Sequence, residues 1–121
     1  MSKTILSVDD SASMRQMVRL TLSGAGYDIV EAVDGKHALD MVGSHAVDLV
    51  ITDLNMPNMD GLALIKALRA HPSCKGVPII FLTTESDEAK KGEAKQSGAT
   101  GWITKPFRQD QLQAVVRRLL G

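Results

Sequence analysis

The sequence of 121 residues has one cysteine, Cys74, and no apolar run longer than four residues. A lone cysteine cannot form an internal disulfide, which is typical of a protein in a reducing compartment. A membrane-spanning helix needs about 20 apolar residues, so membrane insertion is excluded. Asp9 and Asp10 come before the apolar core of a signal peptide could develop. We therefore expect a cytoplasmic protein.

The sequence also lacks an excess of either charge, with 14 Lys and Arg residues against 14 Asp and Glu residues. A general nucleic-acid binder needs a basic surface, so this class is disfavoured. The length and the 44% apolar content suit one globular domain over residues 1–121, without an output domain. The charges are nevertheless divided: residues 1–60 hold four basic and nine acidic side chains, and residues 61–121 hold ten and five.

Five short apolar segments alternate with segments of helical periodicity. The first, third and fourth are almost continuous in Ile, Leu, Val and Phe, as strands buried on both faces of a parallel sheet are. Strict alternation of strand and helix predicts a parallel sheet with helices on both faces. The five predicted strands are Thr4–Val8, Tyr27–Ala32, Val47–Thr52, Val77–Thr83 and Thr100–Thr104.

The predicted helices differ in how strongly the sequence supports them. Gly24 is expected to end the first, and Asp34 is a candidate cap of the second. The segment 87–97 has only Ala89 and Ala94 as apolar residues, with Gly92 in its middle. This segment is interpreted either as a poorly packed surface helix or as a helix of marginal stability that can shift.

Polar side chains follow four of the five predicted strands. Because ligands bind beyond the carboxyl ends of strands in open parallel sheets, these side chains are candidates for one site. The second strand ends in Ala32 and Val33 without such a group, which favours the strand order 2-1-3-4-5 with that strand at the edge. The candidates are Asp9 and Asp10 after the first strand, Asp53 after the third, Thr83 and Thr84 at the end of the fourth, and Lys105 after the fifth.

Three carboxylates in one pocket repel each other and need a compensating charge. A Mg²⁺ ion together with Lys105 would balance Asp9, Asp10 and Asp53. A carboxylate beside such a metal can attack a phosphoryl group and form an aspartyl phosphate. Taken singly, Asp9 and Asp53 could instead be helix caps or turn residues.

Three strings in the sequence resemble the response-regulator receiver domain, and in particular the single-domain CheY-like regulators of bacterial chemotaxis. The likeness spans essentially the whole chain and implies a flavodoxin-like doubly wound α/β fold of five βα units. The strings are Ser7-Val8-Asp9-Asp10-Ser11, Asp53-Leu54-Asn55-Met56-Pro57-Asn58-Met59-Asp60-Gly61 and Thr104-Lys105-Pro106-Phe107.

The resemblance implies a role for each acidic residue. Asp53 would be the phosphoacceptor, and Asp10 and Asp53 would bind Mg²⁺ directly. The backbone carbonyl of Asn55 would be a third protein ligand, while Asp9 would act through water. Lys105 would contact the phosphoryl oxygens.

The resemblance also implies a switch. Thr83 would move its hydroxyl toward the phosphoryl group, and the Lys105–Pro106 peptide bond would be cis. Asn55 and Glu85 would tune dephosphorylation. Trp102 stands where the family usually has Tyr or Phe, and Thr84 where a small residue is usual. Trp102 is therefore interpreted either as the aromatic switch or as core filler.

The leading hypothesis is a monomeric signalling protein rather than an enzyme. Such a protein promotes only its own phosphorylation and dephosphorylation. A chemotaxis-type histidine kinase would be the donor, and the face of the fourth helix, fifth strand and fifth helix would bind a flagellar motor switch protein or another output protein. A dedicated phosphatase is a further possible partner. The basic excess predicts an acidic partner segment. The expected face includes Trp102. The basic residues on or beside it are Lys90, Lys91, Lys95, Arg108, Arg117 and Arg118.

Other functions remain open at this point. The chain could be a phosphate sink that binds no output protein. A Mg²⁺-dependent phosphatase of haloacid-dehalogenase type is disfavoured because Asn55 stands where that class has an acidic general acid. Flavin mononucleotide binding is disfavoured because the carboxylates would repel the flavin phosphate.

Overall fold

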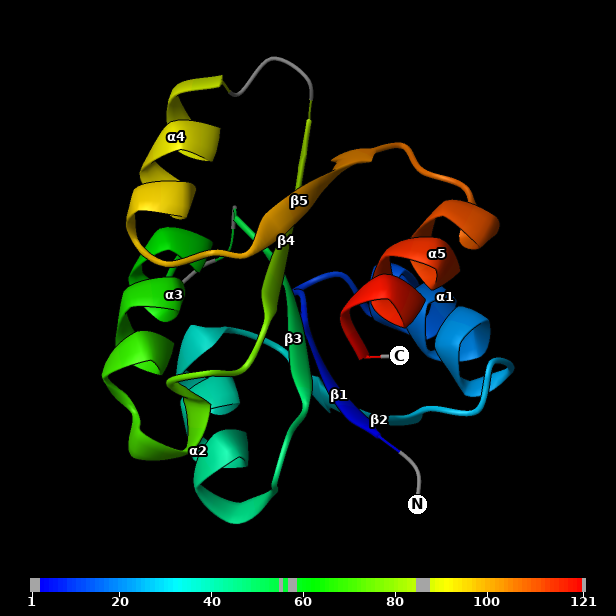
Figure 1. Ribbon diagram of the computed structural model, residues 1–121, viewed down its shortest axis with the longest axis horizontal. Coiled ribbons are helices and arrows are strands. Elements are labelled where there is room, and N and C mark those ends of the chain that lie inside the picture. Colours follow the sequence, from blue (N-terminus) through cyan, green and yellow to red (C-terminus); the bar gives the residue numbers. More distant parts are fainter. Residues whose placement is uncertain (1–2, 55, 57–58, 85–87, 121) are drawn as a thin grey trace.

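The computed structural model describes residues 3–54, 56, 59–84 and 88–120 of the chain. Strands and helices alternate along it as the periodicity predicts (Figure 1). In chain order the elements are β1 (Thr4–Val8), α1 (Ala12–Ser23), β2 (Asp28–Ala32), α2 (Gly35–Ser44), β3 (Leu49–Asp53), α3 (Gly61–Ala70), the short 3₁₀ helix η1 (Pro72–Cys74), β4 (Ile79–Thr84), α4 (Glu88–Gln96), β5 (Gly101–Lys105) and α5 (Gln109–Leu120). None of the helices in these described ranges is long and apolar enough to cross a membrane.

The five strands form one parallel sheet in the order β2-β1-β3-β4-β5. The predicted order is confirmed, with β2 at one edge. Figure 1 shows α2, α3 and α4 on one face of the sheet and α1 and α5 on the other. The carboxyl ends of β1, β3, β4 and β5 therefore meet at one edge, which is where the polar candidates were expected.

The side chains of the central strands alternate between two apolar cores, as the two-residue period of a strand requires. Leu6 and Phe81 pack on the side of α2, α3 and α4. Their neighbours Ile5 and Ile80 pack on the other side, against α1 and α5. Full burial of one such side chain contributes about 1.5–3 kcal/mol, so both faces of the central strands stabilise the fold.

The strand boundaries differ slightly from those predicted. β4 begins at Ile79 instead of Val77 because Pro78 has no N–H for the ladder, although its carbonyl accepts a hydrogen bond from Val50 N at 3.0 Å. β3, β4 and β5 each extend one residue further than expected, so Asp53, Thr84 and Lys105 are the last residues of their strands.

The residues predicted to begin the second helix and to end the first are confirmed. Asp34 caps α2, its side chain accepting a hydrogen bond from His37 N at 2.9 Å. Gly24 is the residue that ends α1, but its backbone is right-handed, with φ −63°. The left-handed residue of this turn is Gly26, with φ +97°, a conformation that glycine adopts without strain.

Candidate functional site

Asp9, Asp10 and Asp53 come together at the carboxyl edge of the sheet. One carboxylate oxygen from each lies within 4.8 Å of the others. Asp9 and Asp53 are buried and Asp10 is exposed. The group therefore has two buried negative charges and one open side. A hard cation with oxygen ligands could be held here.

Asp9 lacks part of its hydrogen bonding. Its Oδ1 accepts a bond from Ser11 N at 2.9 Å, while its buried Oδ2 has no hydrogen-bond partner among the described residues. Burial raises the pKa of this carboxyl above its usual value; the Ser11 hydrogen bond opposes the rise, the Asp53 charge adds to it, Lys105 opposes it and Asp10 adds to it. The orphaned oxygen and the disfavoured negative charge are both features that a bound cation would relieve.

Lys105 supplies positive charge to the same group. Its Nζ lies 3.2 Å from Asp53 Oδ2, and the two side chains are 23% and 12% exposed. Lys105 ends β5, and β4 lies between β5 and β3. The ion pair therefore spans two strand spacings at the carboxyl edge, and it leaves the three carboxylates with a net charge that a divalent cation would neutralise.

The remaining predicted site residues are only partly described. Thr83 is buried on β4, between Asp53 on β3 and Lys105 on β5 in strand order. The Lys105–Pro106 peptide bond is cis. Asn55, Glu85 and the side chain of Thr84 lie outside the described residues.

An arginine that the sequence analysis did not single out supports the Asp9 backbone. Arg15 Nη1 donates a hydrogen bond to the carbonyl oxygen of Asp9, and Arg15 Nε donates to Glu31 on β2 at 3.1 Å. Arg19, one turn further along α1, pairs with the other Glu31 oxygen at 2.6 Å. Burial of Glu31 raises its pKa, but the hydrogen bonds and charges of Arg19 and Arg15 outweigh that effect and lower it. Only the four-residue spacing of the two arginines on one helix face was visible in the sequence.

The segment after Asp53 requires a glycine at its end. The N–H of Gly61 donates to the Leu54 carbonyl at 2.8 Å. A Cβ at Gly61 would lie 2.4 Å from the Asp53 carbonyl oxygen and 2.6 Å from Leu54 Cα. Both are backbone atoms of the site, so they cannot move aside without displacing Asp53. Asp60 caps α3 at the same point, its side chain accepting a bond from Ala63 N at 2.8 Å.

Trp102 lies outside the two cores. It is 40% exposed, so the interpretation as core filler is wrong. Its ring contacts Phe81, with centroids 6.0 Å apart. Lys91, which was expected on or beside the partner face, is buried. A long aliphatic stem lets lysine pack in this way, which residue type alone does not reveal.

Comparison with known proteins gives consistent matches along the chain. The family model described as "Response regulator receiver domain" matches residues 5–117. The chemotaxis protein CheY1 of Helicobacter pylori is 40% identical over 119 residues, which cover 97% of this chain and 96% of that protein. The high-resolution structure of the chemotaxis response regulator CheY4 of Vibrio cholerae superposes with a TM-score of 0.94 at 44% identity, covering 99% of this chain and 100% of that one.

A more distant structure carries a ligand. The receiver domain of the sensor histidine kinase PA1611 of Pseudomonas aeruginosa superposes with a TM-score of 0.90 at 26% identity, covering 98% of both chains. That structure is described as having a magnesium ion coordinated in its active-site cleft.

Proposed function

The chain belongs to the response-regulator receiver family and is a CheY-like receiver of two-component signalling, and we propose that a histidine kinase phosphorylates it on Asp53 in the presence of Mg²⁺. The observation that carries the proposal is the group of Asp9, Asp10 and Asp53, whose oxygens lie within 4.8 Å of one another, with the Lys105 ammonium 3.2 Å from Asp53. This arrangement combines a buried nucleophile, a place for a divalent cation and a fixed positive charge.

The described residues fit Mg²⁺ as the cofactor. Asp10 and Asp53 would ligate it directly and Asp9 would act through water, which would give the orphaned Asp9 Oδ2 a partner. The backbone carbonyl of Asn55 is the further ligand that the family resemblance implies. When bound, Mg²⁺ would offset the charge of the carboxylates and of the incoming phosphoryl oxygens. The magnesium reported for the receiver of PA1611 supports this choice of metal.

The residues divide the transfer between them. A carboxylate oxygen of Asp53 attacks phosphorus and forms the new O–P bond while the P–N bond to the kinase histidine breaks. The imidazole leaves with the bonding electron pair and takes up a proton. Lys105 would stay beside the phosphoryl oxygens and stabilise their charge, and the buried Thr83 hydroxyl would turn toward them. Asn55 and Glu85 would tune the loss of the phosphoryl group.

The output would be a change of binding surface. Thr83 and Trp102 would rearrange together and alter the face of α4, β5 and α5, which a separate output protein recognises. Residues 1–121 would form a single receiver domain that acts as a monomer in the cytoplasm. The resemblance to chemotaxis regulators favours a chemotaxis kinase as donor, a flagellar motor switch protein as output partner and, in addition, a dedicated phosphatase.

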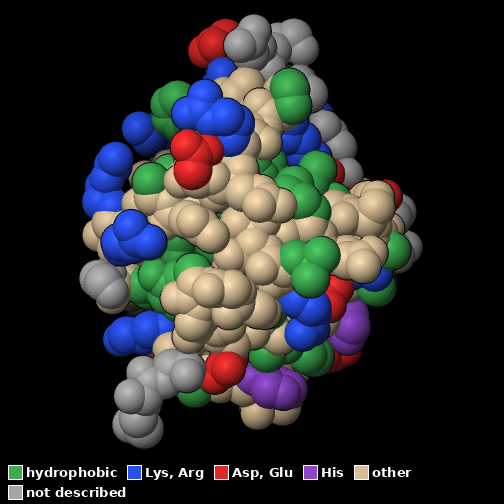
Figure 2. Space-filling view, turned by 90° about the vertical axis from the view of Figure 1, so that its right-hand side faces the viewer, with side chains coloured by type: hydrophobic (Ala, Val, Ile, Leu, Met, Phe, Trp, Pro, Cys, Tyr) green, Lys and Arg blue, Asp and Glu red, His purple; other side chains and the backbone are tan. Residues whose placement is uncertain are grey.

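The charge distribution favours an acidic segment in that partner. Figure 2 looks onto the side of α1 and α5 and shows Lys and Arg side chains gathered along its left edge and upper part, with acidic side chains standing singly. Arg117 and Arg118 lie in the last turn of α5, and Lys95 lies in the last turn of α4. Binding should weaken as salt rises, because exposed charges are screened within about 8 Å at physiological ionic strength.

The test of the proposal is labelling by a small phosphodonor. Wild-type protein should gain one phosphoryl group from acetyl phosphate only with Mg²⁺, as detected by intact-mass spectrometry. Asp53→Asn should gain none, whereas Asp40→Asn, a change at an exposed aspartate on α2, should behave as wild type. Continued labelling of Asp53→Asn would overturn the assignment. Pulldowns of the labelled protein with kinase and motor switch components then separate a messenger from a phosphate sink, since a sink would bind the kinase alone.

A further inference from the structure

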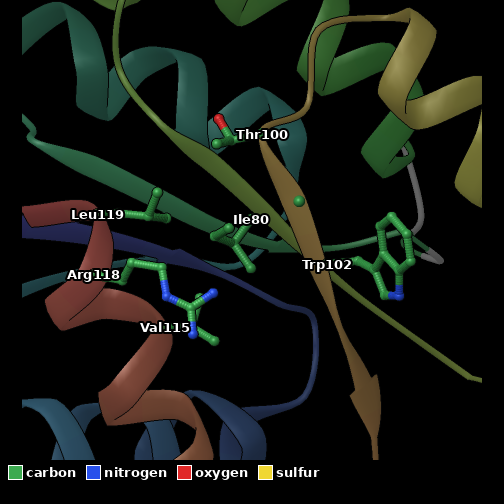
Figure 3. Close-up of a pocket in the computed structure, with 7 residues that line it drawn as sticks. Ile80, Thr100, Trp102, Val115, Arg118 and Leu119 are labelled. Atoms are coloured by element: carbon green, nitrogen blue, oxygen red, sulfur yellow. The ribbon is translucent and has the colours of Figure 1, made fainter.

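Two lysines of α4 lie over the indole ring of Trp102. Lys91 Nζ is 5.6 Å and Lys95 Nζ is 5.1 Å from the ring centroid. A cation within about 6 Å of an indole centroid is attracted by the negative face of the ring. Figure 3 shows the indole on the side of β5 toward α4, away from the α5 residues Val115, Arg118 and Leu119. The ring is thus held between the outer edge of the sheet and the lysine side of α4.

Lys91 is placed unusually for a lysine. It is 8% exposed, and it and Ala94 are the buried residues of α4. Lysine is rarely buried to this degree unless its ammonium has a partner. Its ion pair with Glu88, at 3.3 Å, involves a carboxylate side chain that is 81% exposed, which makes the pair weak. The face of Trp102 is the second partner, so burial of Lys91 depends on where the indole lies.

The indole ring also offsets the repulsion between the two lysines, which follows from their spacing on the helix. Positions 91 and 95 are four residues apart, which places both ammonium groups on the same face of α4. Like charges at this spacing repel each other and destabilise a helix. A shared aromatic face offsets that repulsion, and it does so only while the indole stays outward.

We infer that Lys91 and Lys95 form a lysine latch that holds Trp102 outward, so that inward rotation of the indole must break both cation–π contacts and displace α4. The inference rests on the proposed switching function, in which Trp102 rearranges after phosphorylation of Asp53. The lysines act through Trp102 and are positioning residues of the switch. Each contact at a partly exposed site changes an equilibrium by about two- to fivefold, and both together by about five- to twentyfold.

The latch explains how a weakly apolar helix is coupled to the sheet. α4 has little apolar surface of its own, and the aliphatic stem of Lys91 fills part of the contact that apolar residues make in other helices. Loss of the ring from beneath the ammonium leaves a buried charge whose ion-pair partner in the described part of the chain is the exposed Glu88. The helix must then move to rehydrate Lys91, and the movement changes the surface offered to a partner.

Trp102 is the sole tryptophan of the chain, so its fluorescence reports on the latch directly. The test compares acrylamide quenching of the unphosphorylated protein without Mg²⁺ in wild type and in K91M/K95M, which keeps unbranched apolar stems and removes both charges. A protein that is about 95% outward would fall to about 50–80% outward after a five- to twentyfold shift, and the quenching constant should fall with it. K91R/K95R, which keeps both cations, should quench as wild type does.

Matched variants keep the test decisive. K66M/K75M removes two exposed lysines elsewhere and should leave quenching unchanged. K95M alone changes an exposed residue, so it will fold even if the double variant does not, and it should show a two- to fivefold shift. The latch would be overturned if K91M/K95M or K95M were quenched to the same extent as K66M/K75M. It would also be overturned if the quenching of K91R/K95R differed from that of wild type. Acetyl phosphate labelling of Asp53 is scored separately, so its absence would count against the proposed function and not against the latch.

Discussion

Lys105 Nζ lies 3.2 Å from Asp53 Oδ2, with both side chains largely shielded from water. Lys105 would stabilise an incoming phosphoryl group, and it already forms an ion pair with the carboxylate that would receive that group. A divalent cation entering the site would meet a positive charge beside its ligands, so Lys105 and Mg²⁺ would oppose each other electrostatically while both would stabilise the same negative oxygens.

This opposition predicts that Lys105→Met binds Mg²⁺ more tightly and is phosphorylated more slowly. Removal of a positive charge beside the ligands should tighten binding by about three- to tenfold, a modest gain because the site is partly open to solvent. Loss of the charge that stabilises the transferring group should slow labelling by acetyl phosphate by about a hundredfold. Calorimetric titration with Mg²⁺ and timed labelling measure the two effects. Lys66→Met, a change at an exposed lysine on α3, should change neither, and weaker Mg²⁺ binding by Lys105→Met would contradict the placement of the charge.

Mg²⁺ should stabilise the fold through the acidic group. Mg²⁺ that binds the native state adds about 1.4 kcal/mol to the free energy of unfolding when its free concentration is about ten times the dissociation constant. Urea unfolding with and without Mg²⁺ measures the gain, and EDTA should reverse it. Asp10→Asn removes one proposed ligand and should lose most of the gain, whereas Asp40→Asn should retain it in full. An equal gain in both variants would place the metal elsewhere.

Substitution of Gly61 should destabilise the protein although alanine favours helices. A Cβ at this position would lie 2.4 Å from the Asp53 carbonyl oxygen, so Gly61→Ala must displace the site backbone. We expect a loss of about 1–3 kcal/mol in the free energy of unfolding and slower phosphorylation of Asp53. Gly92→Ala is the matched control in α4, where an added Cβ meets nothing within 4 Å. It should stabilise by about 0.5–1 kcal/mol, so the two changes should differ in sign in urea unfolding.

Glu31 should make a pH-dependent contribution to stability. Its pKa lies below the usual value of 4.5 in the folded protein because of Arg19 and Arg15, despite the opposing effect of burial. A carboxyl with a depressed folded pKa stabilises the fold above its unfolded pKa, and that stabilisation is lost as pH falls through the folded pKa. Glu31→Gln should therefore lower the free energy of unfolding by about 1–2 kcal/mol at pH 7. The difference from wild type should shrink below about pH 4.

Urea unfolding of both proteins at neutral and acidic pH measures this contribution. Glu93→Gln, a change at an exposed glutamate on α4, should match wild type throughout. A difference between Glu31→Gln and wild type that stays constant down to pH 3 would mean that the carboxylate charge is not what Arg15 and Arg19 recognise.

The amino-acid sequence by itself determined the strands and their order. Runs such as Ile79–Leu82 have no polar alternation, because both faces of a central parallel strand are buried. The position of Asp9, Asp53 and Lys105 at strand ends predicted a common edge, and the structure brings all three together there. These features depend on local periodicity and on the topology that it implies.

Tertiary structure alone decided which way individual side chains point and what they contact. The outward ring of Trp102, the burial of Lys91 and the bond from Arg15 to the Asp9 carbonyl depend on how each helix packs against its neighbouring strand. The close approach of Gly61 to the Asp53 carbonyl depends on how α3 docks after β3. Residue type and spacing do not specify such contacts, because they follow from rotamers chosen by packing between layers of the fold.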